Sequence, residues 1–120
     1  MELKIEEIKK DIYGIKITAN EGDKIIGWLQ LYIISNERHD EPYAFLENLY
    51  VEEEYRKHGL GTQLIQAAIE ESKKRYCYKI IGTSRTYKEA VHKFYLKNGF
   101  TNWGYEFRMG LKDSKPKQKD

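Results

Sequence analysis

The chain contains a glycine-rich turn that is suited to binding an anion. Arg56 precedes Gly59 and Gly61 in the pattern Arg-x-x-Gly-x-Gly, and an amphipathic helical stretch follows at once. The start of a helix presents unpaired N–H groups and the positive end of the helix dipole, and glycines let an anion approach the backbone. The pattern therefore predicts a pyrophosphate site. Glycine at position 59 also has a second explanation, a loop-to-helix turn that needs a positive φ angle.

The strand expected before this turn contains an irregularity. Residues 43–51 are rich in aromatic and branched side chains, but the alternation of apolar and polar positions slips once, around Glu47 and Asn48. A one-residue slip moves every following side chain to the other face of a sheet unless an extra residue is accommodated. A β-bulge at this point is therefore expected.

Hydrophobic periodicity predicts the elements that position these residues. Alternating apolar residues predict strands, and a spacing of three to four residues predicts helices. The expected strands are 3–8, 12–19, 24–35, 43–51, 78–83 and 100–111, and the expected helices are 60–75 and 87–97. This order predicts an α+β fold with a mixed, mostly antiparallel sheet, one parallel crossover, and a ligand cleft near the start of the first helix.

Length and composition limit what the chain can be. Its 120 residues suffice for one domain, expected over 1–111, with a disordered basic tail over 112–120 that has no apolar anchor. The net charge of +2 gives little attraction to nucleic acid or to an anionic membrane. A single cysteine, no apolar leader and no apolar run of spanning length predict a cytoplasmic protein. The histidines and the cysteine share no metal-ligand spacing, so no metal is expected.

A second motif, residues 91–100, places Phe94 and Tyr95 on a helix that ends at Gly99. Together with the Arg56 turn, this motif resembles the GNAT superfamily of N-acetyltransferases. The resemblance covers roughly residues 24–111 and implies a GNAT-like sheet with a β-α-β-α-β C-terminal half. The helices that many members carry between their first two strands are expected to be reduced here. The chain departs from the family pattern at Glu53, where proline is common, and at Lys57, where a small residue is frequent.

The resemblance implies an acetyl-CoA-dependent N-acetyltransferase that transfers the acetyl group directly to a primary amine of a small molecule or a protein. The backbone N–H of Val51 would polarise the thioester carbonyl, and the strand opening beside it would admit the pantetheine arm. The cofactor-binding residues that it implies are Leu49, Tyr50, Val51, Arg56, Lys57, His58, Gly59, Leu60, Gly61, Thr62, Arg85 and Tyr95.

Two side chains receive catalytic roles from the same resemblance. Glu47 would take a proton from the amine, and Tyr95 would protonate the departing thiolate. Each also has a structural explanation: Glu47 faces solvent or pairs with a lysine, and Tyr95 packs in the core. Arg85 either contacts the cofactor or is a surface cation.

Other functions stay open from the sequence. One alternative is a non-catalytic acyl-CoA-binding or interaction module, in which the cofactor site survives without turnover. Binding of nucleic acid by the Lys-rich tail has little support at this net charge. Glu37, Asp40 and Glu41 lie in the polar loop 35–42 and hint at a cationic acceptor. The exposed cleft edge and the last expected strand suggest a homodimer as one assembly.

Overall fold

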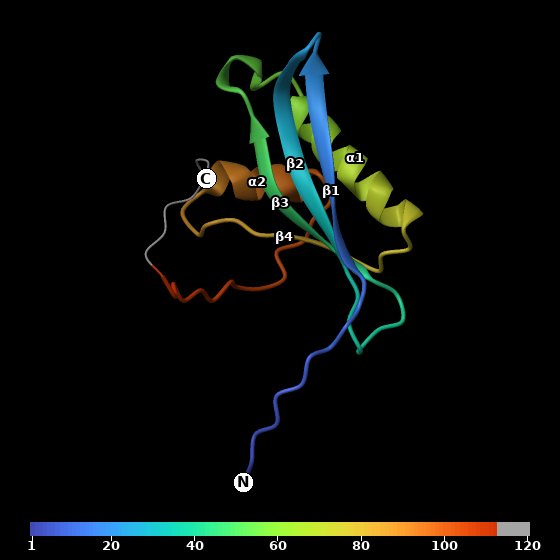
Figure 1. The fold of residues 1–120 in the computed structure, drawn as a ribbon. Coiled ribbons are helices and arrows are strands. Elements are labelled where there is room, and N and C mark those ends of the chain that lie inside the picture. Colours follow the sequence, from blue (N-terminus) through green and yellow to red (C-terminus); the bar gives the residue numbers. More distant parts are fainter. Residues whose placement is uncertain (113–120) are drawn as a thin grey trace. The chain divides into compact units, whose positions relative to one another are not determined.

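The computed structural model describes residues 1–112, which fall into two compact units, Met1–Gly82 and a second that begins at Thr83. The first unit holds a four-stranded sheet and one long helix, and the second holds one shorter helix (Figure 1). The elements are β1 (Ile12–Glu21), β2 (Lys24–Ile34), β3 (Tyr43–Val51), the 3₁₀ turn η1 (Glu53–Tyr55), α1 (Leu60–Lys74), β4 (Ile80–Gly82) and α2 (Glu89–Lys97).

The sheet has the order β1-β2-β3-β4 and is mixed. β1 pairs with β2 and β2 with β3 in antiparallel register, whereas β3 and β4 are parallel. A parallel pair needs a crossover connection, and α1 supplies it. The mixed, mostly antiparallel sheet with one parallel crossover is thereby confirmed.

The core lies between β2, β3 and α1. Leu29, Leu31 and Ile33 occupy alternate positions of β2 and are almost completely buried, as the two-residue period of a strand requires. Leu64, Ile65 and Ala68 supply the buried stripe of α1 at helical spacing. Each fully buried Leu or Ile contributes about 1.5–3 kcal/mol relative to an exposed one, so this contact dominates the stability of the first unit.

A glycine of β2 allows the first turns of α1 to lie close to the sheet. A Cβ at Gly27 would lie 3.1 Å from Cδ1 of Leu64, 3.3 Å from Cδ2 of Leu60 and 3.3 Å from the Tyr50 carbonyl oxygen. The backbone oxygen cannot move aside as a leucine methyl can. The absence of a side chain at position 27 therefore sets how closely α1 approaches the end of β3.

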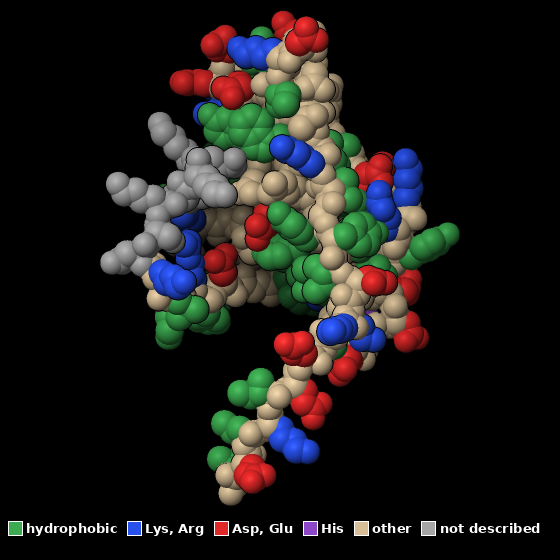
Figure 2. Space-filling model, in the orientation of Figure 1, with side chains coloured by type: hydrophobic (Ala, Val, Ile, Leu, Met, Phe, Trp, Pro, Cys, Tyr) green, Lys and Arg blue, Asp and Glu red, His purple; other side chains and the backbone are tan. Residues whose placement is uncertain are grey.

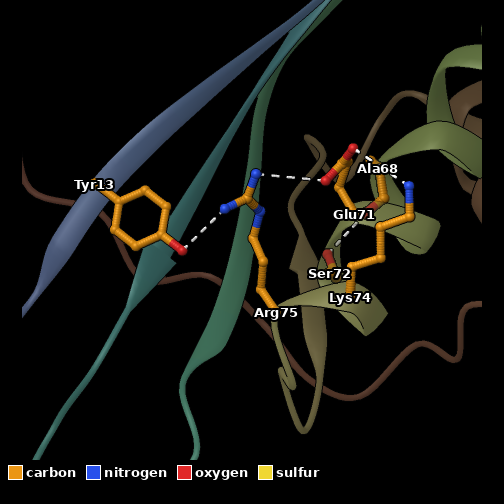
Figure 3. Close-up of polar contacts among 6 residues, drawn as sticks. All are labelled: Tyr13, Ala68, Glu71, Ser72, Lys74 and Arg75. Atoms are coloured by element: carbon orange, nitrogen blue, oxygen red, sulfur yellow. Dashed lines mark hydrogen bonds and ion pairs between the residues drawn. The ribbon is translucent and has the colours of Figure 1, made fainter.

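The other end of α1 is attached to the edge strand (Figure 3). Arg75 donates from Nη1 to the hydroxyl of Tyr13 on β1 at 3.3 Å and pairs through Nη2 with Glu71 at 3.5 Å. Its guanidinium carbon also lies 5.6 Å from the centre of the Tyr13 ring. The last turn buries Ser72, whose hydroxyl donates to the Ala68 carbonyl at 2.8 Å. The contacts between Arg75 and Tyr13 join the C-terminus of α1 to β1.

Most of the expected elements are present. The strands 12–19, 24–35 and 43–51 and the helices 60–75 and 87–97 are confirmed, with ends that shift by a few residues. The expected strand 78–83 is shorter and forms β4. As expected, no helix precedes η1 in the described part of the chain. No helix within residues 1–112 has the length and apolarity needed to cross a membrane.

Two expected strands are wrong. Residues 3–8 and 100–111 have no regular structure in the described chain, so the last strand of the β-α-β-α-β half is absent there. The apolar side chains of both segments are largely exposed, and Figure 2 shows those of the N-terminal segment standing in solvent. Alternation indicates which side chains could be buried, whereas a strand forms only against a neighbouring strand. Of the expected tail, Lys112 is exposed and the rest lies outside the described residues.

Candidate functional site

β3 is bulged at Asn48, as the sequence predicts. Gln30 of β2 pairs with Glu47 and Trp28 with Tyr50, so two residues of β3 face one residue of β2 between these pairs. Asn48 adopts a φ of 57°, in the left-handed region. Its side-chain Nδ2 donates to Oε1 of Gln30 at 2.6 Å. The bulge redirects the end of β3 toward the turn that precedes α1.

The end of β3 is open on one side. β4 pairs with β3 only from Ala44 to Leu46, so in the described chain no strand of the sheet flanks β3 on that side after the bulge. Val51 pairs with Gly27, and the next pair is joined by a 2.9 Å hydrogen bond from the N–H of Glu52 to the Ile26 carbonyl. Since hydrogen-bonded pairs alternate along an antiparallel ladder, the N–H and C=O of Val51 point away from β2, toward the open side.

Arg56 lies against this strand end although its side chain is exposed. Its Nε donates to the Val51 carbonyl oxygen at 2.8 Å. Its guanidinium carbon lies 5.2 Å from the centre of the Tyr50 ring, and that ring lies 4.9 Å from the ring of Trp28. The predicted anion-binding arginine is therefore also attached to β3.

The turn before α1 uses two left-handed residues, Lys57 with φ 66° and Gly59 with φ 84°. Gly59 is the N-cap of α1 and no side chain caps the helix. The first ladder bond runs from the N–H of Gln63 to the Gly59 carbonyl at 3.0 Å, so the N–H groups of Leu60, Gly61 and Thr62 have no acceptor within the helix. A Cβ at position 59 would touch nothing within 4 Å. The backbone angle therefore requires this glycine, and the open space also admits an anion.

The charges around this turn are mixed. Arg56, Lys57 and His58 are exposed, and so are Glu53 and Glu54 just before them. The two carboxylates reach solvent, as is expected for acidic groups beside an anion site. Arg56 and Lys57 and the N–H groups at the start of α1 follow one another closely along the chain, so the positive charge is concentrated at positions 56–62.

Glu47 faces solvent on β3. It makes no ion pair within residues 1–112, so pairing with a lysine is not seen there. Its partner across the ladder, Gln30, accepts hydrogen bonds at Oε1 from Asn48 and, at 3.3 Å, from the Tyr32 hydroxyl. The sequence analysis missed Gln30 and Tyr32. Both residues lie on the half-polar face of β2, opposite the core face that contains Leu29 and Leu31. The alternation of the two faces in the sequence could have indicated them.

Tyr95 lies on α2 in the second unit. The helix ends as predicted at Gly99, whose φ is 93°. The N–H of Phe100 donates to the Tyr95 carbonyl at 3.0 Å, and the N–H of Gly99 donates to the Leu96 carbonyl at 3.1 Å. The Tyr95 ring is 5.1 Å from that of Phe100 and is half-buried. Burial raises the pKa of the Tyr95 phenol above its ordinary value. The phenol is therefore neutral at physiological pH, in agreement with both the acid role and the packing role.

Arg85 lies in the turn before α2, with an exposed side chain. Its carbonyl accepts the N–H of Lys88 at 3.1 Å and Nε2 of His92 at 2.7 Å. Because a carbonyl only accepts, Nε2 of His92 is the donor in this bond, and the His92 side chain is half-buried. The predicted site residues are divided between the two units. The first unit contains Glu47, 49–51 and 56–62, and the second contains Arg85 and Tyr95. No group of potential metal ligands occurs among the described residues.

Comparison with known proteins connects this geometry to a family. A family model described as the acetyltransferase (GNAT) family matches residues 2–100. A solved structure of a proposed acetyltransferase from Agrobacterium tumefaciens is 33% identical, with a TM-score of 0.74 over 78% of this chain and 66% of that one. A transcriptional regulator from Bacillus halodurans is 27% identical, with a TM-score of 0.78 over 82% of this chain and 66% of that one.

A more distant structure shares the fold. It is AAC(6')-Iy in complex with the bisubstrate analogue CoA-S-monomethyl-acetylneamine, 19% identical, with a TM-score of 0.70 over 83% of this chain and 70% of that one. The present chain thus spans about two thirds of the length of the solved structures that it matches. The alternative of a non-catalytic module gains no support from these comparisons.

Proposed function

The chain belongs to the acetyltransferase (GNAT) family, and from this premise we propose that it is an acetyl-CoA-dependent N-acetyltransferase acting on a primary amine. The observation that carries the proposal is the open end of β3 beside a helix start with free N–H groups. The unpaired side of Val51 lies at the end of β3, and the N–H groups of Leu60, Gly61 and Thr62 lie at the start of α1. Only the short turn η1 and the glycine turn separate the two along the chain. They are suited to the two ends of one ligand, a thioester and a pyrophosphate.

Donor binding would use the turn and the strand end together. The pyrophosphate would lie at the start of α1, where Arg56 and Lys57 add positive charge. The pantetheine arm would enter the opening of β3 along Leu49 and Tyr50, and Arg85 is a further candidate for cofactor binding. A CoA-based analogue is bound by the fold relative AAC(6')-Iy, which supports acetyl-CoA as the donor.

The transfer would proceed in one addition and one elimination. Glu47 takes a proton from the ammonium form of the acceptor, and the free amine then attacks the thioester carbon. The N–H of Val51 donates to the developing oxyanion. The C–N bond forms, the C–S bond breaks, and Tyr95 gives its proton to the CoA thiolate. The nitrogen of the new amide loses its extra proton, which returns through solvent to the Tyr95 phenolate, and Glu47 releases its proton to solvent. The raised pKa of Tyr95 keeps the phenol proton in place until the thiolate forms.

Several finer points belong to the same proposal. One domain spans 1–111, and the tail spans 112–120. The acceptor is a primary amine of a small molecule or a protein, and the acidic loop 35–42 favours a cationic one. A cytoplasmic location and a homodimer are kept as expectations.

Isothermal titration with acetyl-CoA and with CoA tests the donor site. The wild-type protein should bind both. Arg56→Glu should abolish binding because it places a carboxylate beside the pyrophosphate, whereas Arg38→Glu, a matched change in the exposed loop 35–42, should leave binding unchanged. An amine screen for CoA release then tests turnover. A wild-type protein that binds neither ligand would refute the proposal.

A further inference from the structure

The nitrogen atoms of the Arg56 guanidinium differ in their contacts. Nε donates to the Val51 carbonyl at 2.8 Å, and the planar group lies over the Tyr50 ring with its carbon 5.2 Å from the ring centre. Among residues 1–112, neither Nη1 nor Nη2 makes a hydrogen bond or an ion pair. The nitrogen next to the aliphatic chain is therefore engaged by the protein, while the two terminal nitrogens are available to a ligand.

The Nε contact completes the support of the strand end. On one side, the N–H of Glu52 bonds the Ile26 carbonyl at 2.9 Å and continues the ladder with β2. On the other side, β4 pairs with β3 no further than Leu46, and the Arg56 side chain bonds the Val51 carbonyl instead. The Tyr50 ring itself packs against the Trp28 ring, with ring centres 4.9 Å apart and planes tilted by 30°, so the ring beneath the guanidinium is supported by β2. The peptide groups around Val51 are thus held from both sides.

We infer that Arg56 is a positioning residue for the acyl group: through Nε–H it holds Val51, so that the Val51 N–H is aimed at the thioester carbonyl. The inference rests on the proposed function, in which that N–H is the oxyanion donor. It differs from a pure phosphate role, because only the terminal nitrogens and the positive charge matter for a phosphate contact. The same side chain would then join pyrophosphate binding to activation of the acetyl group.

The two roles can be separated by two substitutions. In Arg56→Gln, the side-chain Nε2 falls where arginine has Nε, so the donor to Val51 is kept while the charge is lost. In Arg56→Lys, a methylene falls at that position and the ammonium lies beyond it, so the charge is kept while the donor is lost. Because Arg56 is exposed, neither change disturbs the core, and thermal unfolding verifies that both variants fold.

The readout is acetyl-CoA labelled with carbon-13 at the thioester carbonyl, bound to each protein and observed by NMR. A hydrogen bond to this carbonyl moves its resonance downfield. Wild type and Arg56→Gln should show the same downfield shift, whereas Arg56→Lys should lose most of it. Affinity for CoA should follow the opposite order: it falls about tenfold in Arg56→Gln, as the loss of one charged contact predicts, and changes little in Arg56→Lys.

A ligand-free measurement provides the second arm. The Val51 carbonyl shares its peptide group with the N–H of Glu52, so the nitrogen-15 shift of Glu52 should move in Arg56→Lys and stay in place in Arg56→Gln. A wild-type carbonyl shift and an unmoved Glu52 resonance in Arg56→Lys would overturn the inference while leaving the donor site intact. Failure of the wild-type protein to bind acetyl-CoA would instead refute the proposed function and this inference with it.

Discussion

Asn48 and Gln30 are joined side chain to side chain across β3 and β2, at 2.6 Å, at the point where the ladder is bulged. Asparagine tolerates the left-handed conformation found here better than most residues, and its amide also bonds the neighbouring strand. The bulge therefore has both a conformational and a hydrogen-bonding basis. It fixes where β3 leaves its regular course before Val51.

Substitutions at Asn48 should separate the conformational contribution to the bulge from the hydrogen-bonding contribution. Asn48→Gly keeps the backbone angle and loses the bond to Gln30, and should cost about 0.5–1.5 kcal/mol. Asn48→Val adds the strain of a β-branched residue at positive φ and should cost about 1–2 kcal/mol more. Urea unfolding measures both free energies. Equal stability of the two variants would contradict a left-handed residue at this position.

Removal of the carboxylate at Glu47 should lower kcat without changing acetyl-CoA affinity. Glu47→Gln keeps the size of the side chain but cannot accept the ammonium proton, so kcat at neutral pH should fall about 10²–10⁴-fold. The rate of the variant should rise with pH, because the acceptor then supplies its own free amine. Glu54→Gln, an exposed carboxylate just before Arg56, is the matched control. Unchanged turnover in Glu47→Gln would remove Glu47 from the mechanism.

Tyr95→Phe should also lower kcat, by about 10–10³-fold, with CoA affinity nearly unchanged. Burial raises the pKa of Tyr95, so the phenol is protonated in the folded protein beyond its ordinary pKa of about 10. The wild-type rate should therefore show no alkaline decline from this group below about pH 10. The phenol ionises first in the unfolded chain, so stability is full below that pH and falls as pH rises through the folded pKa. A pH series of kcat and of unfolding free energy, for both proteins, measures the two effects.

Gly27→Ala should destabilise the first unit by about 1–3 kcal/mol, because the new methyl meets a backbone oxygen at 3.3 Å as well as two leucine methyls. The same change at Gly104, where a Cβ meets nothing within 4 Å, is the control and should cost little. Thermal unfolding compares the two. The Gly27 variant should also bind acetyl-CoA more weakly, since the crowded contact lies under the first turns of α1.

The two helices end in the same backbone motif with different residues. Tyr76 follows α1 with φ 62°, and Gly99 follows α2 with φ 93°. Relief of left-handed strain, about 1–2 kcal/mol, outweighs the entropy of an added glycine, about 0.5–1 kcal/mol, so Tyr76→Gly should stabilise the protein slightly. Gly99→Ala should destabilise it by about 1 kcal/mol. Chemical denaturation of both variants tests the pair, and destabilisation by Tyr76→Gly would show that the exposed ring has an unrecognised contact.

Sequence patterns predicted those parts of the fold that depend on local chemistry and on burial. The bulge followed from the slip at Glu47, the start of α1 from Gly59 and Gly61, and the end of α2 from Gly99. Pairing could not be predicted in the same way: the alternation at 100–111 is as regular as that of β2, yet no strand forms there in the described chain. A strand forms only where a neighbouring strand provides hydrogen-bond partners, and the sequence alone does not identify that neighbour.

The same distinction between local chemistry and pairing applies to the candidate site. Arg56 was predicted as a cation for an anion, which its exposure allows, but its bond to Val51 depends on where β3 ends in space. Gln30 and Tyr32 were not predicted, because the pattern of β2 indicates only the residues that face the core. The sequence indicates the chemical type of each side chain. Its hydrogen-bond partner depends on the register between β2 and β3, which the structure provides.

Helix α1 is held at both ends, by close packing over Gly27 and by the bond from Arg75 to Tyr13 (Figure 3). Its first N–H groups are therefore aligned before any ligand arrives. Ordering of the helix adds no entropic cost to binding, in contrast to sites that fold around their ligand. Association with acetyl-CoA should accordingly show a small heat-capacity change, of the size expected from the contact surface alone.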